Sequence, residues 1–223
     1  MRPADKHGDK NLNLRGYAPN PDSNFKRELV DYGSGDPTQP PQFATLFDPP
    51  RVPAFSNFYR VHNWNWGTPP EPGTRGDPIK DWPATALGLQ TTPGEPLHTP
   101  KAGYDIGGGM QVIVIYADES TICLKYTRED SAGKGYTVHV DKIKTDPNLL
   151  ALYKKLDDPN GPRYKYPNHE YELPCLAAGQ PFGTAAGAEI VVCIVDTGAF
   201  MDTRSCNEWW QVRPGYTGSC PKP

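Results

Sequence analysis

Proline is concentrated in the first part of the chain, and this limits most strongly what that part can fold into. Of the 26 prolines in 223 residues, 17 lie within residues 1–100. Each proline fixes φ at about −65° and removes a backbone donor, so clusters of prolines cannot continue a helix or a central strand. The clearest clusters are residues 36–41, 48–53 and 68–73. We therefore predict that residues 1–84 form an extended, proline-rich arm.

This arm contains too many aromatic residues for a disordered linker, which is normally poor in large rings. Each ring contributes about 1.5–3 kcal/mol if it is buried, so we expect the rings to dock on a surface. One interpretation makes residues 55–66 the first strand of the following domain. In the other, the arm wraps a partner subunit, or Trp64 and Trp66 form a stacking platform for a sugar. The rings in question are Phe43, Phe47, Phe55, Phe58, Tyr59, Trp64, Trp66 and Trp82.

Residues 85–223 have the pattern of a β domain. Residues 111–117 and 121–126 are short β-branched runs around a turn, which predicts a hairpin. Residues 135–141 alternate, and their polar face carries Thr137 and His139. Residues 190–195 are apolar throughout, so we expect this strand to be covered on both faces.

A single helix is predicted after these strands. Asp146 suits an N-cap and Pro147 suits the first helical position, and apolar residues follow at helical spacing: Leu149, Leu152, Tyr153 and Leu156. The predicted fold class is therefore mostly β: an antiparallel β-barrel or sandwich with one short helix, preceded by the proline-rich extended arm.

Charge and hydropathy exclude two classes of partner. The net charge is −3 and the pI is near 5.9, so the chain has no field that attracts nucleic acid. The longest apolar runs, 112–117 and 190–195, fall far short of the roughly 20 residues that a membrane helix needs. The first ten residues have no apolar core of a secretory signal. Two localisations remain open: a cell-surface protein whose signal has been removed, or an intracellular assembly.

The five cysteines show no metal-ligand spacing such as C-x-x-C, and we predict no cofactor. Cys123 and Cys193 lie in strand-like runs and are expected to be buried thiols. Cys206 and Cys220 flank a polar tail and are a possible disulfide in an oxidising compartment.

Four segments between residues 97 and 197 follow one another in an order that resembles a known family. They are Lys101-Ala102-Gly103-Tyr104-Asp105-Ile106, Gly135–Val138, Tyr153-Lys154-Lys155-Leu156 and Gly179-Gln180-Pro181-Phe182-Gly183. This order is similar to the motifs of the lysostaphin-type zinc endopeptidases, whose β domain cuts peptidoglycan cross-links. The resemblance implies the same β fold for this part of the chain.

The chemistry of that family is not carried over. The resemblance places Lys101 at its first histidine ligand and Lys155 at a catalytic histidine, and its closing His-x-His pair is absent. Only Asp105 is retained, and one carboxylate does not make a zinc site. We therefore predict no catalytic residues and no metal. The alternative is a metal site rebuilt around His98, with His139 approaching from a neighbouring strand and His169 in a loop.

The sequence favours a non-catalytic binding module for a surface glycan or for a cell-wall peptide or protein. If the chain retains the groove of the family fold, Tyr104, Asp105 and Lys155 are expected to lie on the floor of that groove. Trp209 and Trp210 are adjacent, so we expect one to seal the end of the barrel and the other to be exposed or to hold the arm. With Trp64 and Trp66, they are the remaining candidate binding residues.

Two alternatives from other classes stay open. The first is a structural subunit of a filament or other large assembly, in which the N-terminal arm contacts neighbouring proteins or further copies of the chain. The second is a zinc peptidase that uses the rebuilt metal site.

Overall fold

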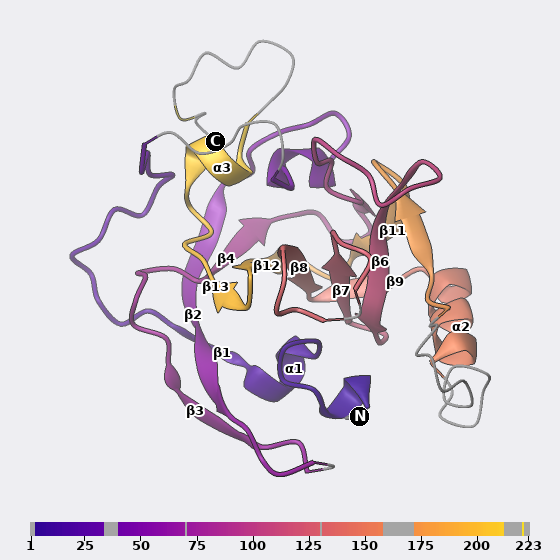
Figure 1. The fold of residues 1–223 in the computed structure, drawn as a ribbon. Coiled ribbons are helices and arrows are strands. Elements are labelled where there is room, and N and C mark those ends of the chain that lie inside the picture. Colours follow the sequence, from indigo (N-terminus) through magenta and orange to yellow (C-terminus); the bar gives the residue numbers. More distant parts are fainter. Residues whose placement is uncertain are drawn as a thin grey trace.

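The computed structural model describes residues 3–33, 40–69, 71–129, 131–157, 172–211 and 220. Within them the chain is mostly β, with antiparallel strands arranged in two sheets (Figure 1). The predicted fold class is therefore confirmed in its sandwich form.

The large sheet contains ten of the described strands. In chain order they are β1 (Tyr17–Pro19), β2 (Phe55–Asn65), β3 (Thr74–Pro78), β4 (Ala86–Gln90), β6 (Met110–Ala117), β7 (Thr121–Lys125), β8 (Tyr136–Asp141), β10 (Cys175–Ala177), β12 (Glu189–Asp196) and β13 (Ala199–Phe200). The main path runs in the order β1-β2-β4-β12-β8-β7-β6-β10, while β13 pairs with β12 and β3 pairs with β2. The sheet does not close on itself. Of the two predicted forms, the barrel is therefore wrong and the sandwich-like arrangement is observed.

A small sheet and several helices complete the described part. The small sheet has the order β5-β11-β9, with β5 at Pro96–His98, β11 at Pro181–Ala185 and β9 at Ile143–Thr145. The helical segments are η1 (Ala4–Lys6), α1 (Leu12–Arg15), η2 (Phe43–Leu46), α2 (Pro147–Leu156) and α3 (Cys206–Trp209). No helix in the described ranges is long and apolar enough to cross a membrane.

The predicted elements of residues 85–223 occur where the patterns indicated. The carboxylate of Asp146 accepts hydrogen bonds from the backbone N–H groups of Asn148 and Leu149, both at 2.9 Å, which begins α2 as predicted. Strand β12 is buried on both faces, as its apolar sequence indicated. The two further α-helices, α1 and α3, have four residues each and were not predicted.

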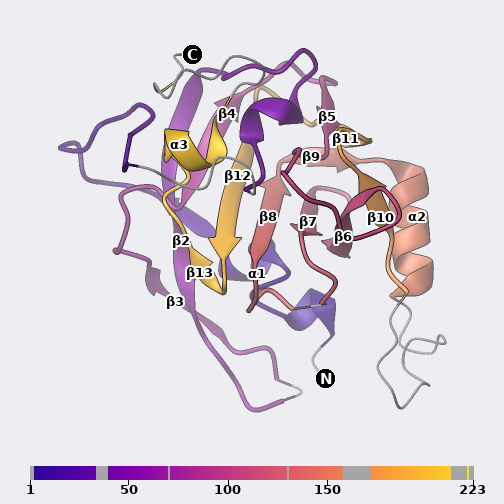
Figure 2. The ribbon, with the colours of Figure 1, turned by 45° about the horizontal axis from the view of Figure 1, so that its top comes forward.

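The large sheet is covered on both faces by segments from far away in the sequence. In Figure 1, η2 and α3 lie above the sheet while η1 and α1 lie below it. Figure 2 shows η2 and α3 in front of β12 and β8. The upper face packs Val192 and Ile194 with Phe43 and Trp210 in the largest core cluster. We call the opposite face, which Leu12 and Ala4 help to cover, the N-terminal face.

Residues of the predicted arm take part in the same sheet and core as the later residues. Strand β2 confirms the predicted strand at residues 55–66, and its register pairs Phe58 with Leu87 of β4. Phe43 and Phe47 are buried in the large core cluster. Strands from before and after position 84, where the sequence placed the boundary between arm and domain, therefore belong to the same sheet.

Candidate functional site

The hairpin formed by β2 and β3 extends away from the body of the molecule (Figure 1). Trp66 follows the last residue of β2 and is 46% exposed, which is unusual for so large a ring. Trp64 lies two residues earlier, opposite Arg75 in the register, and is half-buried. The two candidate rings therefore lie together on this hairpin.

Several contacts hold the two rings in place. The indole N–H of Trp64 donates to the carbonyl oxygen of Pro72 at 2.9 Å. The rings of Trp64 and Trp66 meet edge to face with centroids 6.3 Å apart, and the ring of His7 contacts that of Trp66 with centroids 4.9 Å apart. Edge-to-face pairs of this kind are favourable beyond the area that they bury. The exposed ring is thus supported from two sides.

Two glycines make this packing possible. A Cβ atom on Gly8 would lie 2.6 Å from Cδ2 of Trp64, so only glycine lets the N-terminal segment approach the ring this closely. Gly73 has a φ of 102°, and a Cβ there would lie 2.3 Å from the carbonyl oxygen of Asn65. The shape of the hairpin therefore depends on a residue without a side chain at both positions.

Tyr104 and Asp105 lie together at a second location, the loop between β5 and β6. They line an open pocket of about 320 Å³ with Ala102, Gly103, Gly109, Gln111 and Ala178. Asp105 accepts a hydrogen bond from the backbone N–H of Gly107 at 2.9 Å, and this bond stabilises the turn. Burial, aided by the negative charge of Asp196, raises the pKa of Tyr104. The phenol is therefore neutral at physiological pH.

Lys155 is not part of this pocket. It lies on α2 and is exposed, and no residue of α2 lines the pocket around Tyr104 and Asp105. The structure thus brings together two of the three residues that the sequence placed on one groove floor.

Trp209 and Trp210 are both buried, so neither is exposed. The alternative expectation that one of them holds the arm is confirmed, because the ring of Trp210 packs against Phe43 and Phe55. Trp209 ends α3 and Trp210 caps it, so their directions do not alternate as they would in a strand. Their indole N–H groups donate to the carbonyl oxygens of Asp202 and Thr203, at 3.0 and 2.8 Å. Both rings belong to the core and present no face to a ligand. The nearby Cys206 and Cys220 are joined by a disulfide.

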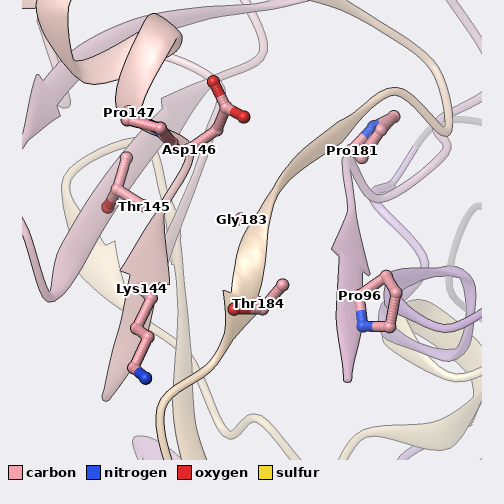
Figure 3. Close-up of a pocket in the computed structure, with 8 residues that line it drawn as sticks. All are labelled: Pro96, Lys144, Thr145, Asp146, Pro147, Pro181, Gly183 and Thr184. Atoms are coloured by element: carbon pink, nitrogen blue, oxygen red, sulfur yellow. The ribbon is translucent and has the colours of Figure 1, made fainter. Parts of the chain in front are cut away.

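Two other pockets lie along the small sheet. The one in Figure 3 has a volume of about 310 Å³ and is lined by Pro96, Lys144, Thr145, Asp146, Pro147, Pro181, Gly183 and Thr184. Asp146 is engaged in capping α2, which leaves Lys144 as the remaining charged side chain of the lining. A neighbouring pocket of about 190 Å³ includes Asp48, His98 and Lys101. Neither pocket brings several charged groups together in a buried place.

The N-terminal face of the large sheet carries a line of buried polar side chains that the sequence did not reveal. Three cross-strand pairs of β7 and β8 form it: Thr121 with Asp141, Cys123 with His139, and Lys125 with Thr137. We call these six residues the polar stripe. They lie under the segment that contains η1 and α1, because Asn13 donates to Thr121 and Ala4 packs with Cys123. The predicted polar face of residues 135–141 is thus covered.

The centre of the stripe is a thiol–imidazole pair. The sulfur of Cys123 lies 3.9 Å from Nε2 of His139, and Nδ1 of the same ring has no hydrogen-bond partner in the described part of the chain. Phe200 stacks on the imidazole with ring centroids 5.9 Å apart. Burial, assisted by the positive charge of Arg15, lowers the pKa of His139 to about 3. The imidazole is therefore neutral at physiological pH.

The rebuilt metal site around His98 and His139 stays without support, and His169 lies outside the described residues. His98 lies on β5 with Nδ1 3.4 Å from the carbonyl oxygen of Leu46, whereas His139 lies within the covered stripe. Among the residues that the structure describes, no three or more histidine, cysteine, aspartate or glutamate side chains are arranged to hold a metal ion.

The comparisons with known proteins identify no relative whose site could be matched to this chain. No family model matches the chain, and no curated protein is significantly similar to it. The lysostaphin-type resemblance therefore rests on the four segments alone. Of these, Gly135–Val138 leads into β8, and Gly179–Gly183 leads into β11.

Proposed function

We propose that this protein is a binding module for carbohydrate, in the first place a cell-wall or cell-surface glycan, and that the β2–β3 hairpin is its contact surface. The observation that carries the proposal is the ring of Trp66, nearly half exposed on a hairpin of the large sheet that extends away from the body of the molecule. A buried Trp stabilises a fold, but an exposed and supported Trp offers an apolar face to a partner.

Sugars suit such a surface because one face of a pyranose ring carries C–H groups while its edge carries hydroxyl groups. The C–H face packs on an indole, and the hydroxyl groups remain in water or bind nearby polar groups. Asn65 and Thr68, on either side of Trp66 in the sequence, are exposed and can donate and accept hydrogen bonds. The hairpin thus presents a large ring flanked by adaptable polar side chains.

Support of the exposed ring favours affinity. His7 and Trp64 contact Trp66 in the structure, so the ring does not have to be ordered when a ligand arrives. Immobilising a flexible side chain on binding costs about 0.5–1.5 kcal/mol, and a ring that is already held avoids part of this cost.

The lysostaphin-type resemblance supports a cell-wall ligand in particular, since that family acts on peptidoglycan. The assembly alternative gains no comparable support. Phe43 and Phe47 of the predicted arm are buried in the chain's own core and are not left for a neighbour.

The test is a binding screen of the full chain against insoluble cell-wall material and immobilised oligosaccharides, repeated with Trp66→Ala. We expect the wild-type chain to be retained and the variant to be lost. Leu152→Ala is the matched control, because Leu152 is also a large apolar side chain, 44% exposed, and lies on α2. Retention of Trp66→Ala to the same extent as Leu152→Ala would refute the hairpin as the contact surface.

A further inference from the structure

The polar stripe holds a pair of side chains with ligand chemistry that the proposed function does not use. We propose that Cys123 and His139 form a two-ligand site for a soft, monovalent metal ion, Cu⁺ or its analogue Ag⁺. The inference is independent of the carbohydrate-binding hairpin.

Sheet register gives the pair its geometry. Cys123 of β7 and His139 of β8 are directly opposite each other, so both side chains leave the same face of two central, hydrogen-bonded strands. Such a scaffold holds two ligands more precisely than a loop does. A second thiol, Cys193 of β12, is the register partner of His139 on the other side.

The separation of the two donor atoms suits an ion between them. Metal ions lie about 2.3 Å from a thiolate sulfur and about 2.0 Å from an imidazole nitrogen. The sulfur of Cys123 and Nε2 of His139 are 3.9 Å apart, which is slightly less than the sum of these two lengths. At these lengths the angle at the ion would be about 130°, so a linear arrangement needs the two donor atoms to move apart by about 0.4 Å, which small side-chain rotations can supply.

The imidazole presents a suitable nitrogen to the thiol. In a neutral imidazole one nitrogen carries a lone pair and the other carries a proton. Nδ1, which lacks a hydrogen-bond partner in the described part, fits the protonated position, and Nε2 faces the thiol. A metal on Nε2 would replace the thiol proton and leave the rest of the ring as it is.

Charge and ligand number select the class of ion. A thiolate and a monovalent cation together are neutral, whereas a divalent cation would leave a net positive charge in a buried place, which is costly. Structural zinc takes four ligands, and the described residues offer no group of three. Thiolate selects soft ions, among which Cu⁺ and Ag⁺ accept two ligands in a line.

The thiol and the imidazole are both buried. Phe200 covers the imidazole, and Ala4 and Ile115 pack with Cys123. Two positive charges lie near the pair: the ammonium group of Lys125, which belongs to the same stripe, donates to the carbonyl oxygen of Lys134, and the guanidinium group of Arg15 is paired with Asp9. Binding follows the reaction Cys123–SH + M⁺ → Cys123–S–M + H⁺, in which the proton leaves to solvent and no group is oxidised or reduced.

The test is a silver titration of the full, oxidised chain in chloride-free buffer, followed to equilibrium by native mass spectrometry and by proton release. Cys175 is an exposed thiol and would bind silver by itself, so the reference protein is Cys175→Ser. We expect this reference to take up one ion with release of one proton. Adding Cys123→Ser is expected to abolish uptake, whereas adding Cys193→Ser is expected to preserve it.

Three results would overturn the inference: no uptake by the reference protein, uptake that survives Cys123→Ser, or uptake that is lost with Cys193→Ser in a folded protein. X-ray absorption of the loaded reference protein decides the matter even if a variant fails to fold. One sulfur and one nitrogen neighbour are expected, and two sulfur neighbours would contradict the assignment to His139.

Discussion

Two pairs of tryptophans, similar in sequence, have opposite surroundings in the fold. Trp209 and Trp210 are buried beside α3, and both of their N–H groups are hydrogen-bonded to nearby carbonyl groups. Trp64 and Trp66 lie on the β2–β3 hairpin, where Trp64 is hydrogen-bonded to Pro72 and Trp66 is nearly half exposed. The comparison shows that one residue type provides stability at one place and a contact surface at another.

The largest effect is expected at the buried pair. Trp210 is fully buried and packs against Phe43 and Phe55, with ring centroids 5.4 and 5.6 Å away. We expect Trp210→Ala to lower the free energy of unfolding by about 3–5 kcal/mol, because it leaves a cavity in the core. Denaturant unfolding measures this change. A loss below about 1 kcal/mol would show that the buried pair does not support the fold.

Opening the disulfide is expected to have the next largest effect, and on the same region. The bridge joins residues 14 apart and holds Cys206, the first residue of α3, to Cys220. A closed loop of this length stabilises a fold by about 3 kcal/mol in the chain-entropy account. The Cys206→Ala/Cys220→Ala variant is therefore expected to melt earlier, while glycan binding persists below its melting temperature. Loss of binding in the folded variant would mean that the two regions are coupled.

Trp64 should show an intermediate effect on stability and a clear effect on binding. Its ring is half-buried against Gly8 and supports Trp66. We expect Trp64→Ala to cost about 1–2 kcal/mol of stability, within the usual range for a partly buried side chain, and to weaken glycan binding through the loss of support. Trp64→Phe keeps a ring without the hydrogen bond to Pro72, so it should retain most of the binding. Equal binding losses for the two variants would contradict the support role.

Trp66 should show the smallest effect on stability. The ring of Trp66 is more than half covered and contacts His7 and Trp64, so we expect Trp66→Ala to lower the free energy of unfolding by about 1 kcal/mol or less in thermal and denaturant unfolding. If the variant is strongly destabilised, Trp66 is part of the core like Trp209 and Trp210, and the difference between the two pairs disappears.

The sequence predicts the elements of this fold well, because the signals for them are local. Alternation and β-branched runs locate the strands, and Asp146 with Pro147 locates the start of α2. The sequence does not predict which face of a strand is covered. The polar side of residues 135–141 looks solvent-exposed, and its cover comes from residues 3–16, more than a hundred positions earlier.

The candidate sites were also predictable only where the signal is local in the sequence. The rings of Trp64 and Trp66 lie in contact, and their spacing of two residues already indicated that both lie on one side of an extended segment. Trp210 holds the arm, as one of the two expectations stated, whereas the burial of both rings was not foreseen because a short helix, and not a strand, carries them. The Cys123–His139 pair depends on the register between β7 and β8, for which the sequence carries no local signal.

The most direct test of the account is the equilibrium affinity of the wild-type, Trp66→Ala and Leu152→Ala chains for a soluble cell-wall oligosaccharide that the wild type binds, measured by calorimetry at a temperature where all three are folded. We predict that Trp66→Ala loses at least about tenfold in affinity, or about 1.4 kcal/mol, while Leu152→Ala binds like the wild type. Equal affinities for all three chains would contradict the claim that the hairpin is the carbohydrate-binding surface.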